Sequence, residues 1–207
     1  LIRMRDAQIL ALHLGMSGRI RILDPRAGGD LTRQKHDHFF LTLDTGVQIV
    51  LNDARRFGMV FLFSSPAEME AHAAFRSLGP EPLAADFSGL VLRGRLAGRK
   101  TAIKLAIMDQ SIVAGVGNIY ASEALFRAGI SPFRPAQALD ADEAQRLAEA
   151  IASVLEDAIA AGGSSLKDYR KADGSMGYFQ HGFAVYDRQG QKCPRCGAGP
   201  ESDGGGI

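Results

Sequence analysis

Short apolar runs separated by turn-forming residues fill the first sixty-three positions of the chain. In these runs apolar residues either follow one another or alternate with polar ones, which is the pattern of β-strands. The runs are residues 9–14, 20–23, 39–43, 48–51 and 59–63. Asp44-Thr45-Gly46 separates two of them and has the composition of a compact hairpin turn. We therefore predict an antiparallel sheet region.

After residue 65 the apolar residues recur every three or four positions, which predicts α-helices. The predicted helices are residues 67–75 (opened by Pro66), 86–96, 102–108, 119–128 and 140–161. The last has the clearest ends, because Asp140 and Glu143 have the spacing of a capping box and Gly162-Gly163 follows. Its apolar stripe consists of Leu147, Ile151, Val154, Leu155 and Ile159. Residues 183–186 again predict a strand, which leads into a pair of cysteines.

The composition is that of a globular protein with a buried core. The chain has 207 residues, of which 46% are hydrophobic and 23% charged, and this excludes a disordered or collagen-like chain. No run approaches the roughly 20 apolar residues of a membrane span, and the start of the chain lacks the regions of a signal peptide. We therefore expect a bacterial cytoplasmic protein that does not act at a membrane. The chain starts at Leu1 without an initiator methionine, which we interpret as a sign of a fragment.

Charge is distributed unevenly along the chain, although the formal net charge is only +1. Residues 87–108 contain five cations and no acid, namely Arg93, Arg95, Arg99, Lys100 and Lys104. Residues 140–157 contain six acids and one arginine. One face of the protein can therefore meet a polyanion while another stays in solvent.

Cys193 and Cys196 have the spacing of a zinc knuckle, in which two thiolates from a tight turn supply half of a tetrahedral site. The residues after Cys196 contain no further cysteine or histidine, so this pair supplies only half of the ligands. A redox dithiol and two free thiols are the alternative interpretations.

Residues 114–118, Ala-Gly-Val-Gly-Asn, lie between two predicted helices. Asn118 is placed to cap the second helix, and the exposed backbone N–H groups at a helix start favour a bound phosphate. Lys104 on the preceding helix could share that phosphate. A tight turn between two helices would have the same glycine pattern, so both interpretations remain open.

Residues 53–58, Asp-Ala-Arg-Arg-Phe-Gly, interrupt a strand pattern with two guanidinium groups beside an aromatic ring. Arg55 could hydrogen-bond a base edge while Phe57 wedges between base steps. The alternative is a solvated arginine pair with a core phenylalanine. In the same way, the turn at residues 14–18 either exposes Met16 or buries it as a core side chain.

Considered together, these stretches resemble formamidopyrimidine-DNA glycosylases over residues 1 to about 197. The resemblance is carried by residues 13–18 (His-Leu-Gly-Met-Ser-Gly), 35–38 (Lys-His-Asp-His), 53–58 and 78–83 (Leu-Gly-Pro-Glu-Pro-Leu). Thr101 to Lys104, Asp109-Gln110 and residues 115–123 resemble the helix-two-turns-helix of that family, and residues 165–169 resemble its lesion-binding loop. The implied fold is α+β, with three segments. They are an incomplete antiparallel β-sandwich at 1–65, a helix-two-turns-helix DNA-binding domain with the lesion-binding loop at 66–182, and a truncated zinc finger at 183–207.

The resemblance implies a base-excision repair enzyme that flips an oxidised purine such as 8-oxoguanine or a formamidopyrimidine out of double-stranded DNA. It would cleave the glycosidic bond and then cut the strand by β,δ-elimination as an AP lyase. Met16, Arg55 and Phe57 would fill the void left by the base. Phosphates would be held by His13, His36, Arg99, Lys104, Asn118 and Tyr186, and Lys167 with its neighbours to Tyr178 would form a lid over the base. His38, Asp109 and Glu123 would have structural roles, and the protein would act as a monomer.

The family's nucleophile and one zinc cysteine pair have no counterpart in this sequence. The nucleophile is an N-terminal proline followed by a glutamate, and we expect both upstream of Leu1, so the chain as given is predicted to be inactive with no catalytic residue of its own. Cys193 and Cys196 would be ligands of the family's single zinc ion. Asp187 replaces a glycine expected after Tyr186. Two alternatives remain, an endonuclease VIII-type enzyme for oxidised pyrimidines and a non-catalytic helix-two-turns-helix module that binds nucleic acid.

Overall fold

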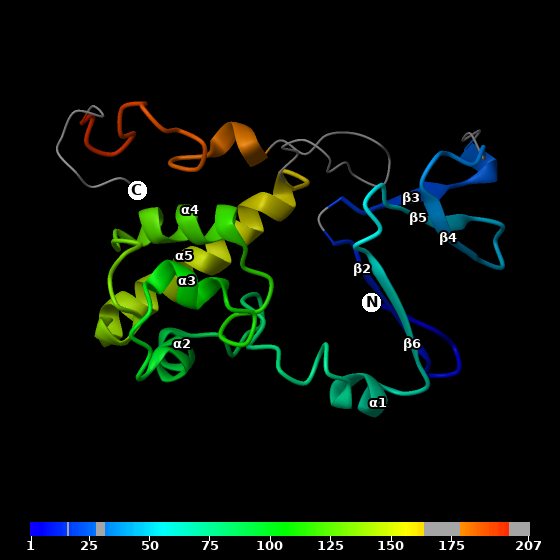
Figure 1. Cartoon of the computed structure of the whole chain (residues 1–207), viewed down its shortest axis with the longest axis horizontal. Helices are drawn as coiled ribbons and strands as arrows, with labels where there is room; N and C mark the ends of the chain where they lie inside the picture. The colour runs from blue at the N-terminus through cyan, green and yellow to red at the C-terminus, as the bar shows by residue number, and fades with distance from the viewer. Residues whose placement is uncertain (16, 28–31, 164–178, 199–207) are drawn as a thin grey trace. The chain divides into compact units, whose positions relative to one another are not determined.

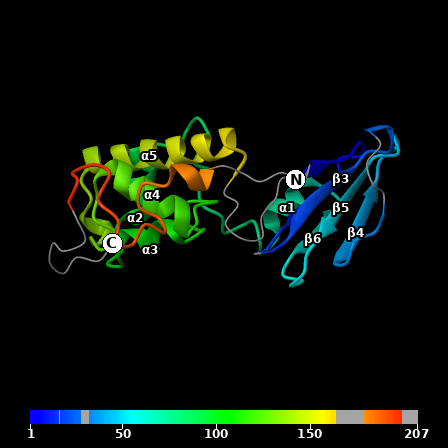
Figure 2. The ribbon, with the colours of Figure 1, turned by 90° about the horizontal axis from the view of Figure 1, so that it is seen from above.

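The computed structural model describes residues 1–15, 17–27, 32–163 and 179–198. The chain divides into two compact units (Figures 1 and 2). The first consists of Leu1–Phe75 with Ala161–Gln180, and the second of Arg76–Ala160 with His181–Ile207. Each unit has its own core, so each is described by itself. The segment boundaries after residues 65 and 182 stay predictions.

The first unit contains two antiparallel three-stranded sheets. One has the order β1-β2-β6 and the other β3-β5-β4. The strands are β1 (Ile2–Arg3), β2 (Ile9–His13), β3 (Arg19–Leu23), β4 (Asp37–Thr42), β5 (Gln48–Asn52) and β6 (Met59–Phe63). The five predicted strands are all present, with ends that shift by at most two residues. The predicted hairpin turn is also confirmed, because β4 and β5 pair from Thr42 opposite Gln48 and Gly46 adopts a φ of +84° in the turn.

The core of the first unit lies between the sheet β1-β2-β6 and the helix that follows it. Ile9, Ala11 and Phe63 are buried there, and Met69 of helix α1 (Pro66–Ala71) and Phe75 pack against them. The helix starts as predicted at Ser65 and Pro66, but it ends at Ala71 and not at residue 75. The reason is aromatic packing, because the centre of the His72 ring lies 5.1 Å from the centre of the Phe61 ring and 5.3 Å from that of the Phe63 ring. His72 adopts an extended backbone conformation that ends the helix.

In its described residues, the second unit contains four packed α-helices. They are α2 (Gly89–Leu96), α3 (Ile103–Met108), α4 (Asn118–Ala128) and α5 (Ala141–Ala160). Helix α5 packs against both α2 and α4, and its buried face includes Leu147, Ile151 and Val154. Among the described residues, no helix is both long and apolar enough to cross a membrane. The α+β fold with antiparallel strands and a helical domain is thus confirmed.

Helix α5 confirms its predicted capping box and corrects one predicted core residue. The Asp140 backbone N–H donates to Glu143 Oε2 at 3.0 Å, and the Glu143 N–H donates to Asp140 Oδ1 at 2.8 Å. Ile159, however, is 65% exposed, and Ala158 is the buried residue of the last turn. A residue four positions after Val154 returns to the buried face, whereas the fifth points away from it.

Residues 183–186 do not form the predicted strand. A short 3₁₀ helix at Phe179–Gly182 precedes them, and no strand follows it in the described residues. Their backbone N–H groups do not pair with a strand. Those of Ala184, Val185 and Tyr186 all donate to the carboxylate of Glu123, at 2.8–3.0 Å. A side chain on α4 therefore replaces the neighbouring strand that the sequence pattern led us to expect.

Candidate nucleic-acid interface

Arg55 and Phe57 lie together on an exposed turn between β5 and β6. Phe57 is 57% exposed, and the Arg55 guanidinium carbon lies 5.8 Å from the centre of its ring. Asp53 fixes the turn. Its side chain is buried and accepts hydrogen bonds from the N–H groups of Arg55 at 3.2 Å and Gly58 at 2.7 Å. An exposed ring with a nearby cation on a fixed turn has the geometry of a wedge that enters a base stack.

The loop at residues 13–18 packs directly against this turn. Gly15 has a φ of +61°, and a Cβ added there would lie 2.8 Å from the backbone carbonyl carbon of Phe57. Only glycine fits this close approach. His13 is exposed, and its Nδ1 accepts a hydrogen bond from the Gly15 N–H at 3.2 Å. Met16, predicted to help fill the void, lies outside the described residues.

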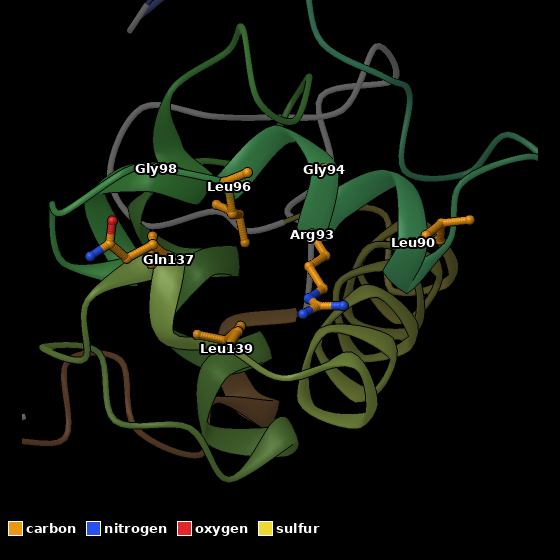
Figure 3. Close-up of a pocket in the computed structure, with 9 residues that line it drawn as sticks. Leu90, Arg93, Gly94, Leu96, Gly98, Gln137 and Leu139 are labelled. Atoms are coloured by element: carbon orange, nitrogen blue, oxygen red, sulfur yellow. The ribbon is translucent and has the colours of Figure 1, made fainter.

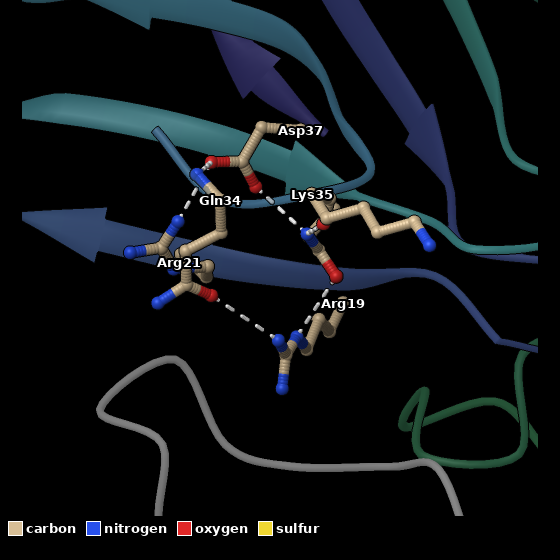
Figure 4. Close-up of polar contacts among 6 residues, drawn as sticks. Arg19, Arg21, Gln34, Lys35 and Asp37 are labelled. Atoms are coloured by element: carbon tan, nitrogen blue, oxygen red, sulfur yellow. Dashed lines mark hydrogen bonds and ion pairs between the residues drawn. The ribbon is translucent and has the colours of Figure 1, made fainter. Parts of the chain in front are cut away.

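Asp37, whose side chain is covered, organises the segment that carries Lys35 and His36. Asp37 accepts hydrogen bonds from Arg21 Nη1 at 2.7 Å, from the Gln34 N–H at 2.8 Å and from Asn52 Nδ2 at 2.8 Å. Figure 4 shows Arg21, Gln34 and Asp37 close together, with dashed lines for the contacts of Asp37. Burial alone would raise the pKa of Asp37, but these hydrogen bonds and the Arg21 charge hold it below its ordinary value.

The same network fixes the backbone on either side of His36. Asn52 Nδ2 also donates to the Lys35 carbonyl at 2.9 Å, and Asn52 Oδ1 accepts from Arg19 Nε at 3.2 Å. His36 itself has a φ of +75°, in the left-handed region that non-glycine residues rarely adopt. Its side chain is partly exposed, as a phosphate contact requires. His38 has the structural role predicted for it, because its Nε2 donates to the Asp53 carbonyl at 3.0 Å.

In the second unit the glycine-rich turn before α4 is present, with one correction. The residue at the N-cap position is Gly117, and Asn118 is the first residue of the helix, without the predicted capping hydrogen bond. The turn is fixed by Gln110, which donates to the carbonyl of Val116 at 3.1 Å and accepts from the Gly115 N–H at 2.8 Å. Asn118 is exposed at the helix start.

Arg99 and Lys104 lie near this turn in the sequence and differ in their contacts. Arg99 Nη1 forms an ion pair with Asp109 Oδ2 at 3.3 Å, and both side chains are roughly 40% exposed. Asp109 also accepts hydrogen bonds from the Ser111 hydroxyl and N–H, which lower its pKa, so its structural role is confirmed. Lys104 on α3 is partly exposed, and its N–H donates to the Pro132 carbonyl.

Tyr186 is positioned by a buried glutamate. Glu123 is 1% exposed and binds the Tyr186 N–H at 2.8 Å, as one of three such bonds. The Tyr186 ring packs edge-on against that of Phe183, with 5.5 Å between ring centres. The structural role predicted for Glu123 is confirmed. Lys167 and the predicted lid to Tyr178 lie outside the described residues.

A cavity of about 390 Å³ beside α2 does not belong to these residues. Leu90, Arg93, Leu96 and Gln137 are among its lining residues, as Figure 3 shows. None of the side chains predicted to contact DNA lines it. We therefore do not assign the cavity to the candidate interface.

The cysteine turn offers two metal ligands. The Cys193 N–H donates to the Ala198 carbonyl, and the Gly197 N–H donates to the Cys193 carbonyl, both at 2.9 Å. Backbone N–H groups of Cys196 and Arg195 lower the pKa of the Cys193 thiol, which favours the thiolate that zinc binds. Within the described part of the chain, no group of three or more His, Cys, Asp or Glu side chains could hold a metal. The residues present thus fit half of a tetrahedral zinc site and do not complete one.

Sequence reasoning missed four residues that fix candidate contact segments within their own units, namely Asp37 and Asp53 in the first unit and Gln110 and Arg195 in the second. Arg195, between the two cysteines, donates to the carbonyls of Phe126 and Arg127 at the end of α4 and lies 4.6 Å from the centre of the Phe126 ring. A local signal existed for Asp53 alone, because an aspartate at the start of an irregular segment commonly accepts from N–H groups a few residues later.

Two family models match the chain. The N-terminal domain of formamidopyrimidine-DNA glycosylase matches residues 1–60, and its H2TH domain matches residues 78–170. A formamidopyrimidine-DNA glycosylase of Rhodospirillum rubrum is 49% identical over 205 residues, covering 99% of this chain and 72% of that protein. One of Laribacter hongkongensis is 50% identical over 197 residues, covering 95% of this chain and 70% of that protein. The chain belongs to the formamidopyrimidine-DNA glycosylase family.

Solved structures agree with this assignment. The MutM (Fpg) protein of Thermus thermophilus is similar with a TM-score of 0.81 at 41% identity, covering 94% of this chain and 70% of that one. The Lactococcus lactis Fpg in complex with DNA that contains an abasic site has a TM-score of 0.79 at 35% identity, covering 93% and 68%. A complex of the Lactococcus lactis protein with Fapy-dG containing DNA gives 0.79 at 34%, covering 94% and 69%.

Proposed function

We propose that this protein is a base-excision repair DNA glycosylase that removes oxidised purines, 8-oxoguanine and formamidopyrimidines, from double-stranded DNA. In the intact protein, cleavage of the glycosidic bond is followed by AP-lyase β,δ-elimination. The observation that carries the proposal is the packing of loop 13–18 against turn 53–58, which presents Arg55 and Phe57 as exposed neighbours. Related structures with lesion or abasic DNA support the same substrate.

Removal of a base from a duplex leaves a void that the protein has to fill. Flipping the nucleotide costs a few kcal/mol of lost stacking and pairing. We propose that Met16, Arg55 and Phe57 fill this void. Arg55 would face the orphaned cytosine, and Phe57 would be wedged beside it. The guanidinium can donate two parallel hydrogen bonds, and the ring replaces part of the lost stacking. These assignments rest on the exposure of Arg55 and Phe57 and on their common turn.

Phosphate contacts on both units would hold the DNA around the flipped base. We propose His13 and His36 for the first unit and Arg99, Lys104, Asn118 and Tyr186 for the second. Asn118 at the start of the eleven-residue helix α4 adds exposed backbone N–H groups and the positive end of the helix dipole. Lys167 would belong to the lid over the base. All of the roles proposed for this chain's residues are in recognition, and none is that of the nucleophile.

Zinc has a structural place in the proposal. We propose that Cys193 and Cys196 supply two of its four ligands. A bound zinc ion would stabilise the turn through which Arg195 contacts α4, and no chemical step is assigned to it.

Because the proposed substrate is chromosomal DNA, we propose that the protein acts in the bacterial cytoplasm, at the nucleoid. We also propose that it acts as a monomer.

Binding and trapping experiments test the function together. The chain is expected to bind a duplex with 8-oxoguanine opposite cytosine at least tenfold more tightly than the same duplex without the lesion. The reason is that flipping a damaged base out of the stack costs less free energy than flipping an intact one. Borohydride trapping with the protein extended upstream to its start codon is expected to give a covalent adduct with the same duplex. Equal affinity for both duplexes contradicts the proposal. Intact binding without any adduct would instead favour a non-catalytic DNA-binding module.

A further inference from the structure

Asp53 is a buried carboxylate to which the proposed recognition roles assign no function. It is 1% exposed and, within the described residues, it forms no ion pair. Its charge is met by hydrogen-bond donors instead, with the Ser17 hydroxyl at 2.6 Å as the shortest, together with the N–H groups of Arg55 and Gly58. A buried carboxylate that accepts several hydrogen bonds fixes the positions of all its donors.

The backbone of Asp53 extends these connections to a third segment. Its N–H donates to the His36 carbonyl at 2.9 Å, and its own carbonyl accepts from His38 Nε2 at 3.0 Å. One residue thus joins loop 13–18, segment 35–38 and turn 53–58, three stretches of the first unit that contain predicted DNA contacts. Within this unit, the relative positions of those contacts depend on Asp53.

Two of the joined segments contain backbone strain. His36 has a φ of +75° and Arg56 a φ of +57°, and neither is a glycine. Residues in the left-handed region persist only where the surrounding structure holds them. The hydrogen bonds of Asp53 to the N–H groups of Arg55 and Gly58 lie on either side of Arg56 and provide that restraint.

We propose, on the basis of the proposed function, that Asp53 is a positioning residue for lesion recognition, because its carboxylate locks turn 54–58 to Ser17 and presents Arg55 and Phe57 as one preformed wedge. A wedge that is ordered before binding loses little conformational entropy when it enters the void. The hydrogen bond from Ser17 contributes most to a lowered pKa of Asp53, so the carboxylate stays ionised at neutral pH.

The variant Asp53→Asn tests this role because it keeps the size of the side chain and replaces one accepting oxygen with an NH₂ donor that faces other donors. The measurement is the ratio of two dissociation constants, one for an intact duplex and one for the same duplex with a tetrahydrofuran abasic analogue opposite cytosine. We expect this ratio to fall about tenfold, which corresponds to the loss of roughly one charge-assisted hydrogen bond. The salt dependence of binding to the intact duplex should not change, because no phosphate contact is removed.

Glu68→Gln is the matched control, because the Glu68 carboxylate also binds a serine hydroxyl and a backbone N–H in the same unit, at Ser64. It contacts none of the three joined segments in the described structure, so it should leave the ratio unchanged. Ser17→Ala is the second variant, since it removes only the hydrogen bond from the Ser17 hydroxyl to Asp53 and preserves the bonds of Asp53 to the turn. We expect Ser17→Ala to lower the ratio about threefold and to speed hydrogen exchange at the Arg55 and Gly58 amides.

The outcomes separate this inference from the proposed function. If the wild-type chain prefers the abasic duplex and Asp53→Asn keeps that preference, the positioning role is wrong and the function stands. An equal loss of affinity on both duplexes also overturns it, because that is what a merely structural residue would show. If Asp53→Asn does not fold, an unchanged ratio in Ser17→Ala overturns it. A wild-type chain without preference for the lesion contradicts the proposed function and, with it, any role of Asp53 in recognition.

Discussion

Asp53 in the first unit and Glu123 in the second are both buried carboxylates that bind several backbone N–H groups, but they connect the chain over different distances. Asp53 binds the N–H groups of residues two and five positions later, besides Ser17. Glu123 binds three consecutive N–H groups that lie 61–63 positions later. The first shapes a local turn, and the second attaches a distant segment to α4. A carboxylate can therefore organise a binding surface either by bending the chain or by joining two parts of it.

The largest effect is expected where the long-range connection is cut. In Glu123→Gln one accepting oxygen becomes a donor, which leaves at least one of the part-buried N–H groups of residues 184–186 without its partner. We expect the free energy of unfolding to fall by about 3 kcal/mol. Urea unfolding followed by circular dichroism measures it. Glu149→Gln on the exposed face of α5 is the control and should change stability by less than about 0.5 kcal/mol. A loss below about 1 kcal/mol for Glu123→Gln would mean that the segment is held by other contacts.

A smaller effect is expected at the contact between loop 13–18 and turn 53–58. Gly15→Ala places a Cβ 2.8 Å from the Phe57 carbonyl carbon at a φ of +61°, so the substitution combines strain with a clash. We expect a loss of about 2 kcal/mol, measured as a lower melting temperature. Gly94→Ala in α2 is the matched control, because nothing lies within 4 Å of the added Cβ and alanine favours the helix. Gly94→Ala should raise stability, and a similar loss in both variants would argue against the tight contact.

The comparison also explains which parts of the fold could be predicted from the sequence. Strands and the α5 capping box depend on neighbouring residues, so alternation of apolar positions and the Asp140–Glu143 spacing were sufficient. The strand predicted at residues 183–186 was wrong because its N–H groups are bound by Glu123, which no local pattern reveals.

The site was predictable in the same uneven way. Arg55 and Phe57 could be singled out as candidates because they form an unusual cluster of cations and an aromatic ring in one turn. The bond between Ser17 and Asp53 could not be predicted, since the two residues lie 36 positions apart and the pairing of their loops is set by tertiary structure. The predicted cap at Asn118 failed for a related reason, because Gln110 already fixes the turn before α4.

Within the interface, Arg55 and Lys104 should respond differently to the presence of a lesion. Arg55→Ala is expected to weaken binding to lesion or abasic duplexes by about 1–3 kcal/mol, because the orphaned base is available only there. Binding to intact duplex should change much less. Fluorescence anisotropy on the paired duplexes measures both constants. Equal losses on the two duplexes would remove the base-reading role from Arg55.

Lys104 provides the contrasting case, in which the effect should be small and independent of the lesion. Its side chain is partly exposed on α3, and no ion pair is seen for it among the described residues. If it neutralises one phosphate, Lys104→Ala lowers affinity on all duplexes and reduces the slope of log K against log salt by about one unit. Binding constants determined at several salt concentrations, from low to moderate, give that slope. Lys35→Ala on the first unit provides a second cation for comparison. An unchanged slope would identify Lys104 as a charge on the helix surface, and the phosphate contacts of the second unit would then be left to Arg99, Asn118 and Tyr186.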